Sequence, residues 1–139
     1  MKLSEHFDLK ELTASGTARR LGFTEQFEPG PEEVENLQRV AENILEPIRA
    51  KFGAFTPTSA YRCARLNEAV KGAPNSHHVM GFAVDIDLGI RNKELHDWVM
   101  NNLEYTQLIN EYPDAEGNPD WVHVSYNPQN LKKKNLTIK

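Results

Sequence analysis

The chain has 139 residues, of which 39% are hydrophobic and 26% charged, and its formal net charge is -4 at pH 7. These values are typical of a globular protein and argue against a disordered or membrane-embedded chain, while the negative charge argues against general nucleic-acid binding. The only cysteine, Cys63, cannot form an internal disulfide, so folding does not need an oxidising compartment.

The length favours one domain over residues 1–139, because a chain of this size buries a large enough core to fold alone. We expect the core of this domain over about residues 30–127, after a helical lead-in over 1–29 and before a basic tail over 128–139. The first residues alternate charged and apolar side chains, so we expect no signal peptide, no stable membrane insertion and synthesis in the cytoplasm. We expect a monomer.

The first part of the chain is predicted to be helical. One or two short helices are expected over residues 3–22, followed by a loop to Gly30. The strongest helix is predicted from Pro31 to about Lys51, with Pro47 expected to kink or shorten its last turn. Its buried stripe recurs at helical spacing and comprises Val34, Leu37, Val40, Ala41, Ile44, Leu45 and Ile48.

The middle of the chain is predicted to mix short strands and helices. A strand over residues 55–61 is expected to end in a polar cluster that includes Tyr61 and Arg62, and a short helix follows over 64–70. A second strand is expected over residues 82–87.

The last third is predicted to hold a helix over residues 93–103 and then a hairpin. Its strands are expected over 107–112 and 121–126, which flank the turn-rich loop PDAEGNPD. The tail after Pro128 is expected to add an edge strand or to fray.

One stretch, SHHVMGFAVDID over residues 76–87, is dense in residue types that bind metals. In an extended strand Asp85 and Asp87 lie on the face opposite Val84 and Ile86. One face of this strand is therefore predicted to pack in the core and the other to carry the functional side chains.

A further metal-binding residue is expected on the last predicted strand of the hairpin, where His123 alternates with apolar residues. If the two strands are neighbours, Asp85 and His123 converge, and His78 reaches them from the preceding loop. Three protein ligands with an open fourth position are typical of a catalytic zinc, whereas structural zinc sites use four ligands, mostly cysteines. The sequence therefore predicts a catalytic rather than a structural site.

Two carboxylates are candidates for the general base that such a site needs. Asp120 lies three residues before His123 and is the first choice, and Glu111 at the end of the other hairpin strand is the second. Arg62 is the candidate cation for a substrate carboxylate or a developing oxyanion.

These residues resemble the zinc D-Ala-D-Ala carboxypeptidase family, which also contains D-Ala-D-Ala dipeptidases and phage L-alanyl-D-glutamate endopeptidases. The family signature is S-x-H-x-x-G-x-A-x-D followed by a distal histidine. It is met by Ser76, His78, Gly81, Ala83, Asp85 and His123, with Tyr61 and Arg62 upstream. The resemblance covers roughly residues 30–127, and the opening HFDLKELTAS is similar to the start of small phage and prophage members.

The resemblance implies an α+β, hedgehog-type fold with a central antiparallel sheet and packed helices. It implies zinc held by His78, Asp85 and His123, with Asp120 as the base. Arg62 is implied to stabilise the substrate, and we expect Ser76 and Tyr61 to contribute to substrate binding.

The expected function is zinc-dependent hydrolysis of a bond in the peptidoglycan stem peptide, of the carboxypeptidase or endopeptidase type. The expected partners are stem peptides, and delivery to the wall would use a holin or a phage tail. The alternative is a non-catalytic domain that binds wall peptides or serves a phage tail structurally. His77 stands beside His78 as a second possible ligand, although the spacing favours His78, and the bond that is cleaved stays open.

Overall fold

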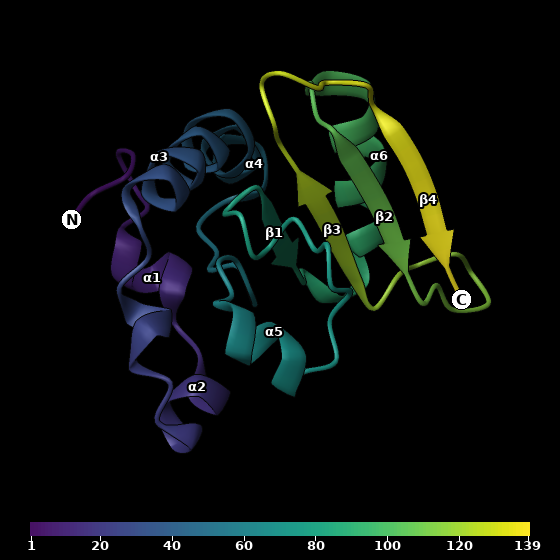
Figure 1. Cartoon of the computed structure of the whole chain (residues 1–139). Helices are drawn as coiled ribbons and strands as arrows, with labels where there is room; N and C mark the ends of the chain where they lie inside the picture. Colours follow the sequence, from purple (N-terminus) through teal and green to yellow (C-terminus); the bar gives the residue numbers. More distant parts are fainter.

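The computed structural model describes all of residues 1–139 and shows an α+β fold, which confirms the predicted class. The helices and strands are α1 (Leu9–Thr13), α2 (Gly16–Leu21), α3 (Pro31–Val40), α4 (Glu46–Phe52), α5 (Ala64–Ala69), β1 (Ala83–Ile86), α6 (Asn92–Asn102), β2 (Gln107–Glu111), β3 (Trp121–Ser125) and β4 (Lys134–Ile138). In Figure 1 the first four helices lie on one side of the molecule and the strands on the other, with α6 behind the sheet.

The sheet has the order β1-β3-β2-β4. The pairs β1/β3 and β3/β2 are antiparallel, so the predicted hairpin and the predicted neighbourhood of residues 83–86 with β3 are confirmed. The tail forms the fourth strand, β4, which pairs in parallel with β2. The sheet is therefore mixed at one edge, because the chain after β3 crosses over before it pairs with β2.

The long helix predicted over residues 31–51 is present but contains a wider turn. Between α3 and α4 lies a π-helical turn, Ala41–Leu45, in which the amide of Glu46 donates to the carbonyl of Ala41. Pro47 has no amide to donate, and the wider turn before it lets the helix continue to Phe52. The proline therefore changes the hydrogen-bond pattern upstream rather than ending the helix.

The predicted strand over residues 55–61 is wrong. Only Ser59 forms a bridge there, opposite Asp85, supported by the bonds from the amide of Thr58 to the Asp85 carbonyl and from the amide of Asp85 to the Ser59 carbonyl. Pro57 cannot donate a backbone bond, so the ladder does not extend. The segment still runs beside β1 and brings Arg62 near Asp85.

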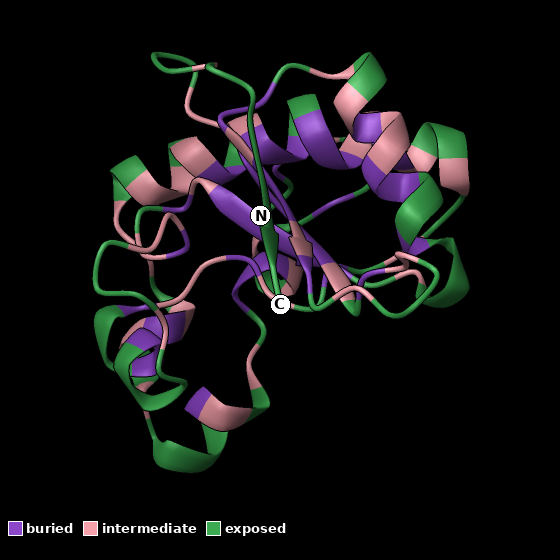
Figure 2. Cartoon of the chain, turned by 90° about the vertical axis from the view of Figure 1, so that its right-hand side faces the viewer, coloured by how far each residue is buried: buried purple, intermediate pink, exposed green.

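The main core lies between the long helix and the sheet, and α6 packs on β2 and β3. It includes Leu3, Phe7 and Leu12, so the N-terminal segment is part of the same core as the sheet. Figure 2 shows buried residues in the centre of the sheet and on the inner sides of the helices, with the C-terminal strand exposed. Val84 and Ile86 face this core, as the alternation predicts.

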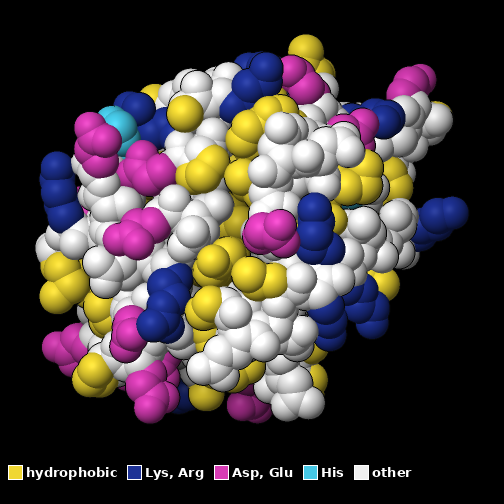
Figure 3. Space-filling view, turned by 90° about the horizontal axis from the view of Figure 1, so that it is seen from above, with side chains coloured by type: hydrophobic (Ala, Val, Ile, Leu, Met, Phe, Trp, Pro, Cys, Tyr) yellow, Lys and Arg dark blue, Asp and Glu magenta, His cyan; other side chains and the backbone are white.

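The outer surface is mixed in charge where it can be followed. On the face drawn in Figure 3, Lys and Arg side chains lie among Asp and Glu. None of the helices is both long and apolar enough to cross a bilayer.

Candidate active site

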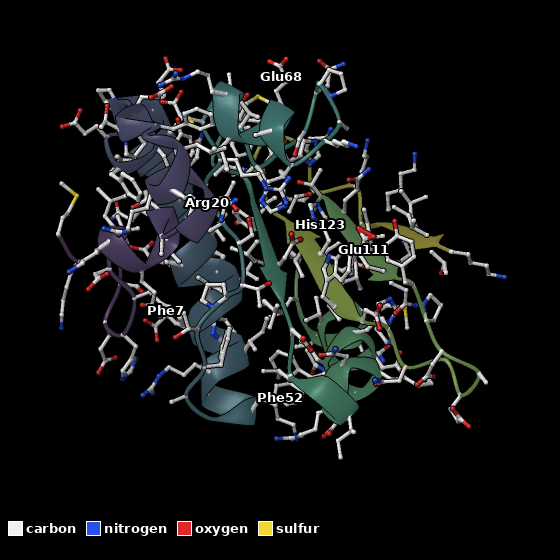
Figure 4. The ribbon with its side chains drawn as sticks, turned by 90° about the horizontal axis from the view of Figure 1, so that it is seen from below. Phe7, Arg20, Phe52, Glu68, Glu111 and His123 are labelled. Carbon is white, nitrogen blue, oxygen red and sulfur yellow. The ribbon has the colours of Figure 1, made fainter.

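A cavity of about 610 Å³ opens on the sheet face opposite α6. One wall is the segment from Val70 to His78, after α5, and the floor is formed by side chains of β1, β2 and β3. In Figure 4 His123 on β3 and Glu111 on β2 lie next to each other on the side towards α5. Because side chains alternate along a strand, the residues opposite the core face converge here.

Three buried side chains with metal-ligating atoms meet on this floor. His78, Asp85 and His123 each offer one ligand atom, and these atoms lie within 4.8 Å of one another. Nε2 of His78 is 3.3 Å from Oδ2 of Asp85, and Nδ1 of His123 is 3.0 Å from Oδ1 of the same carboxylate. The structure thus brings together the three residues that the sequence singled out.

The backbone pairing explains why Asp85 and His123 meet. They are direct partners in the antiparallel register of β1 and β3. Their side chains leave the sheet on the same face, since residues directly opposite each other in a ladder share a face.

His78 is positioned by the loop before β1. Its Nδ1 lies 2.6 Å from the carbonyl oxygen of Ala60, so this nitrogen donates and Nε2 is free to act as a ligand. The hydroxyl of Ser76 accepts from the amide of His78 at 3.2 Å. The side chain of His78 is 3% exposed, whereas His77 lines the cavity but is outside the three-residue cluster.

Gly81 lets this loop pass close to α3. Its φ is +79°, and a Cβ placed there would lie 2.7 Å from the carbonyl oxygen of Glu33. Both the conformation and the close approach require glycine.

The electrostatics of the cluster favour an ionised Asp85. Burial alone would raise the pKa of its carboxyl, but hydrogen bonds from His123 and His78 and their charges hold the pKa well below its usual range. A permanently charged oxygen donor between two imidazoles is therefore present.

Arg62 lies in the cavity, but each of its side-chain nitrogens has a partner within the chain. Nη2 is 3.3 Å from Oδ2 of Asp85, Nε is 3.3 Å from Oγ of Ser59, and Nη1 is 3.3 Å from Oδ1 of Asn67. In this arrangement Arg62 orients the Asp85 carboxylate, and its predicted contact with substrate stays a prediction.

The two candidate bases occupy different environments. Glu111 lines the cavity and is 9% exposed, and burial raises the pKa of its carboxyl, with the charges of His123 and Arg62 opposing and that of Asp85 adding to the rise. Asp120 is exposed, precedes β3 and does not line the cavity. The position therefore favours Glu111 over the first choice made from sequence.

Two further predicted residues differ in placement. Ser76 lines the cavity, whereas Tyr61 does not and instead lines a smaller hollow next to Ala14 and Leu66. Asp87 lies outside the cavity, where Oδ1 accepts from the amide of Gly89 and from Asn92. Tyr61 and Asp87 thus stay away from the ligand cluster.

The sequence did not single out several lining residues. Those on the sheet are Gln107, Ile109, Tyr112, Trp121 and Ile138. The alternation of β2 with Glu111 carried a signal for Gln107 and Ile109, because all three share a face. Ile138 had none, since its contribution depends on the parallel pairing of the tail.

A family model described as Peptidase M15 matches residues 5–125. The chain therefore belongs to the peptidase M15 family, a family of metallopeptidases. Among curated proteins none matches the chain.

The residues fit the metal that this family implies. Two imidazoles and one carboxylate are a donor set that zinc accepts, and three protein ligands leave a position open for chemistry. His78 would bind through Nε2, because Nδ1 is engaged by Ala60.

Proposed function

We propose that this chain is a zinc-dependent peptidase that hydrolyses an amide bond in the stem peptide of bacterial peptidoglycan, of the D-Ala-D-Ala carboxypeptidase or endopeptidase type. The observation that carries the proposal is the convergence of His78, Asp85 and His123 beside Glu111, in one cavity of a peptidase M15 family member. The motif order quoted above supports the choice of substrate.

His78, Asp85 and His123 would hold the zinc ion. When bound, zinc supplies Lewis-acid chemistry, lowering the pKa of water and polarising a carbonyl. Glu111 is the base: its buried carboxylate accepts the proton of the attacking water and returns it to the leaving amine. No covalent bond forms between the protein and the substrate, because none of the lining residues is a nucleophile paired with a base.

Arg62 has a positioning role in this proposal. Its fork holds the carboxylate of Asp85 through Nη2 while Ser59 and Asn67 fix the other nitrogens. The guanidinium would stabilise a substrate carbonyl or carboxylate without losing all of its present hydrogen bonds, because it has five N–H donors. Ser76 supports His78 from the loop.

The biological setting is part of the same proposal. A phage or prophage lysin acting as a monomer on wall stem peptides fits the motif and the size of the domain. It would be delivered by a holin or carried in a tail.

The test is digestion of purified peptidoglycan by the zinc-loaded protein. We expect new amino and carboxyl termini, and mass spectrometry of the fragments from defined muropeptides identifies the bond. If zinc-loaded protein binds the wall but releases no new termini, the chain is a binding or structural domain and the proposal fails.

A further inference from the structure

Two aromatic side chains stand at the far end of the catalytic cavity. The rings of Tyr112 and Trp121 are 5.4 Å apart between centroids and tilted by 55°. Both line the cavity that holds Glu111 and His123. Trp121 is two residues before His123 on the same face of β3 and pairs across the sheet with Glu111. The aromatic pair therefore lies within two residues of Glu111 and His123 along the chain.

Tyr112 is held there in an unusual conformation. Its φ is +54°, in the left-handed region that non-glycine residues rarely adopt, and its side chain is nonetheless 48% exposed. A tyrosine in the left-handed region is strained by contacts between its side chain and the backbone. Its exposed ring also gains little from the burial of apolar area. Such strain is typical of residues that are retained for binding.

The C-terminal strand holds the backbone of Tyr112. The amide of Tyr112 donates to the carbonyl of Ile138 at 2.7 Å, and Ile138 itself reaches the cavity. The Ile138 side chain is 39% exposed. The family match ends at residue 125, so β4 and Ile138 lie beyond it. This end of the cavity is thus built partly by residues that the family model does not cover.

A second hollow, of about 640 Å³, adjoins the first and shares Tyr112 with it. Its other walls are the loop from Pro113 to Gly117 and Lys139. Asp114 lines it, and Oδ1 of Asp114 accepts from the amides of Glu116 and Asn118, which fixes the carboxylate. Tyr112 therefore separates an apolar end of the catalytic cavity from a hollow that has two charged lining residues, Asp114 and Lys139.

We propose that Tyr112, Trp121 and Ile138, with Asp114 beyond them, form a subsite for a pyranose ring of the glycan to which the stem peptide is attached. The proposal rests on the endopeptidase form of the proposed function, because the sugar is joined to the L-alanine end of the stem peptide and lies several residues away from a D-Ala-D-Ala bond. The C–H face of a pyranose packs on aromatic and aliphatic side chains, and its hydroxyl rim needs fixed polar acceptors such as a carboxylate.

The alternative occupant, an alanine methyl group, fits this place less well. A methyl group gains most from a small, closed apolar pocket, whereas this surface is open and includes the charged residues Asp114 and Lys139. A pyranose ring is also large enough to contact Tyr112 and Ile138 together. The subsite therefore predicts a preference for stem peptides that still carry their sugars.

The experiment compares two substrates that share one stem peptide, one with the disaccharide attached and one without it. We expect the zinc-loaded parent to cleave the disaccharide form with a kcat/KM roughly tenfold higher, mainly through a lower KM, the size that an aromatic contact supplies. In Tyr112→Asn the ratio should fall close to one, and in Tyr112→Phe it should stay near the parental value. Asparagine tolerates the left-handed backbone, so Tyr112→Asn removes the ring without adding strain.

Two further variants make the test specific. Ile138→Ser removes an aliphatic contact from the same subsite and should lower the ratio. Leu21→Asn is the matched control, because Leu21 on α2 is 49% exposed and lies outside both hollows. It should leave the ratio unchanged.

The possible results separate the two proposals. Equal cleavage of both substrates by the parent, or a preference that survives Tyr112→Asn, overturns the saccharide subsite while the peptidase proposal stands. If the parent cleaves neither substrate, the proposed function is wrong and the subsite falls with it.

Discussion

Two of the places where histidine and carboxylate side chains meet in this molecule have different outcomes. Near the N-terminus, Nδ1 of His6 lies 2.7 Å from Oε1 of Glu46, whose Oε2 accepts from the hydroxyl of Ser4. On the sheet, Asp85 stands between His78 and His123. The first cluster ties the N-terminal segment to α4, and the second has the donor set of a metal site.

The difference lies in the number of imidazoles and in burial. One oxygen of Glu46 contacts the imidazole of His6. The other accepts hydrogen bonds from the hydroxyl of Ser4 and the amide of His6, so the cluster has no third metal-ligating side chain. Asp85 has two buried imidazoles and a half-buried guanidinium around it. A short contact between histidine and carboxylate therefore says little by itself, whereas convergence from three elements on one buried oxygen pair indicates a metal centre.

The largest expected effect comes from Asp85→Asn. Zinc retention and peptidase activity should both be lost, because the variant removes the only charged oxygen donor. Unfolding of the zinc-free protein in urea should also show a loss of about 3 kcal/mol, since Arg62 loses the carboxylate that pairs with it. Metal content after dialysis is the direct measurement, and retention of one zinc per chain would contradict the ligand assignment.

Glu111→Gln separates metal binding from catalysis. We expect zinc to remain bound while turnover falls by roughly 10²- to 10⁴-fold, the usual contribution of a general base. Asp120→Asn is the comparison variant and should keep most of the parental kcat. The opposite pattern in steady-state kinetics would return the role of base to Asp120.

Removal of zinc should affect the sheet cluster and leave the N-terminal one unchanged. A ligand present at a hundred times its Kd stabilises the folded state by about 2.7 kcal/mol, so a chelator should lower the Tm of the parent. Scanning calorimetry should show the same drop in Glu46→Gln and none in Asp85→Asn. An equal drop in Asp85→Asn would mean that the metal binds elsewhere.

Glu46→Gln is expected to have the smallest effect, a loss of about 1 kcal/mol or less, because the pair is partly exposed and screened. Burial acts to raise the pKa of Glu46, but bonds from Ser4 and His6 outweigh it and lower the pKa below 4.5. A lowered folded-state pKa stabilises above pH 4.5, and this stabilisation is lost as the pH falls through the folded-state pKa. Urea unfolding of parent and variant should therefore differ at pH 6 and converge in more acidic solution, with peptidase activity unchanged at neutral pH.

Much of the site could be predicted because its signal is local. Strand alternation placed Asp85 and His123 on the chemical face, and strand pairing then made them partners. Spacing already favoured His78 over His77, but the bond that holds the His78 ring, to the carbonyl of Ala60 18 residues away, could not be predicted. The preference for Asp120 came from its spacing to His123, whereas Glu111, the second choice from sequence, is the carboxylate that lines the cavity.

The parts of the fold that escaped prediction depend on hydrogen bonds between distant segments. Residues 55–61 have the composition of a strand, yet Pro57 and a single bridge at Ser59 limit the pairing. The tail has the alternation of an edge strand, but its parallel pairing with β2 depends on a crossover that periodicity does not encode. The contribution of Ile138 to the cavity follows from that pairing alone.

The glycine of the motif has a consequence for transplanting this site. Because a side chain at residue 81 would collide with the Glu33 carbonyl, the loop that carries His78 and the start of α3 fit together as a matched pair of surfaces. Copying the short motif into another scaffold would supply metal-ligating side chains without the contact between the loop and α3 that positions His78. A designer would have to transfer the helix terminus with the motif, and any natural recombination that separated them would inherit a misplaced ligand.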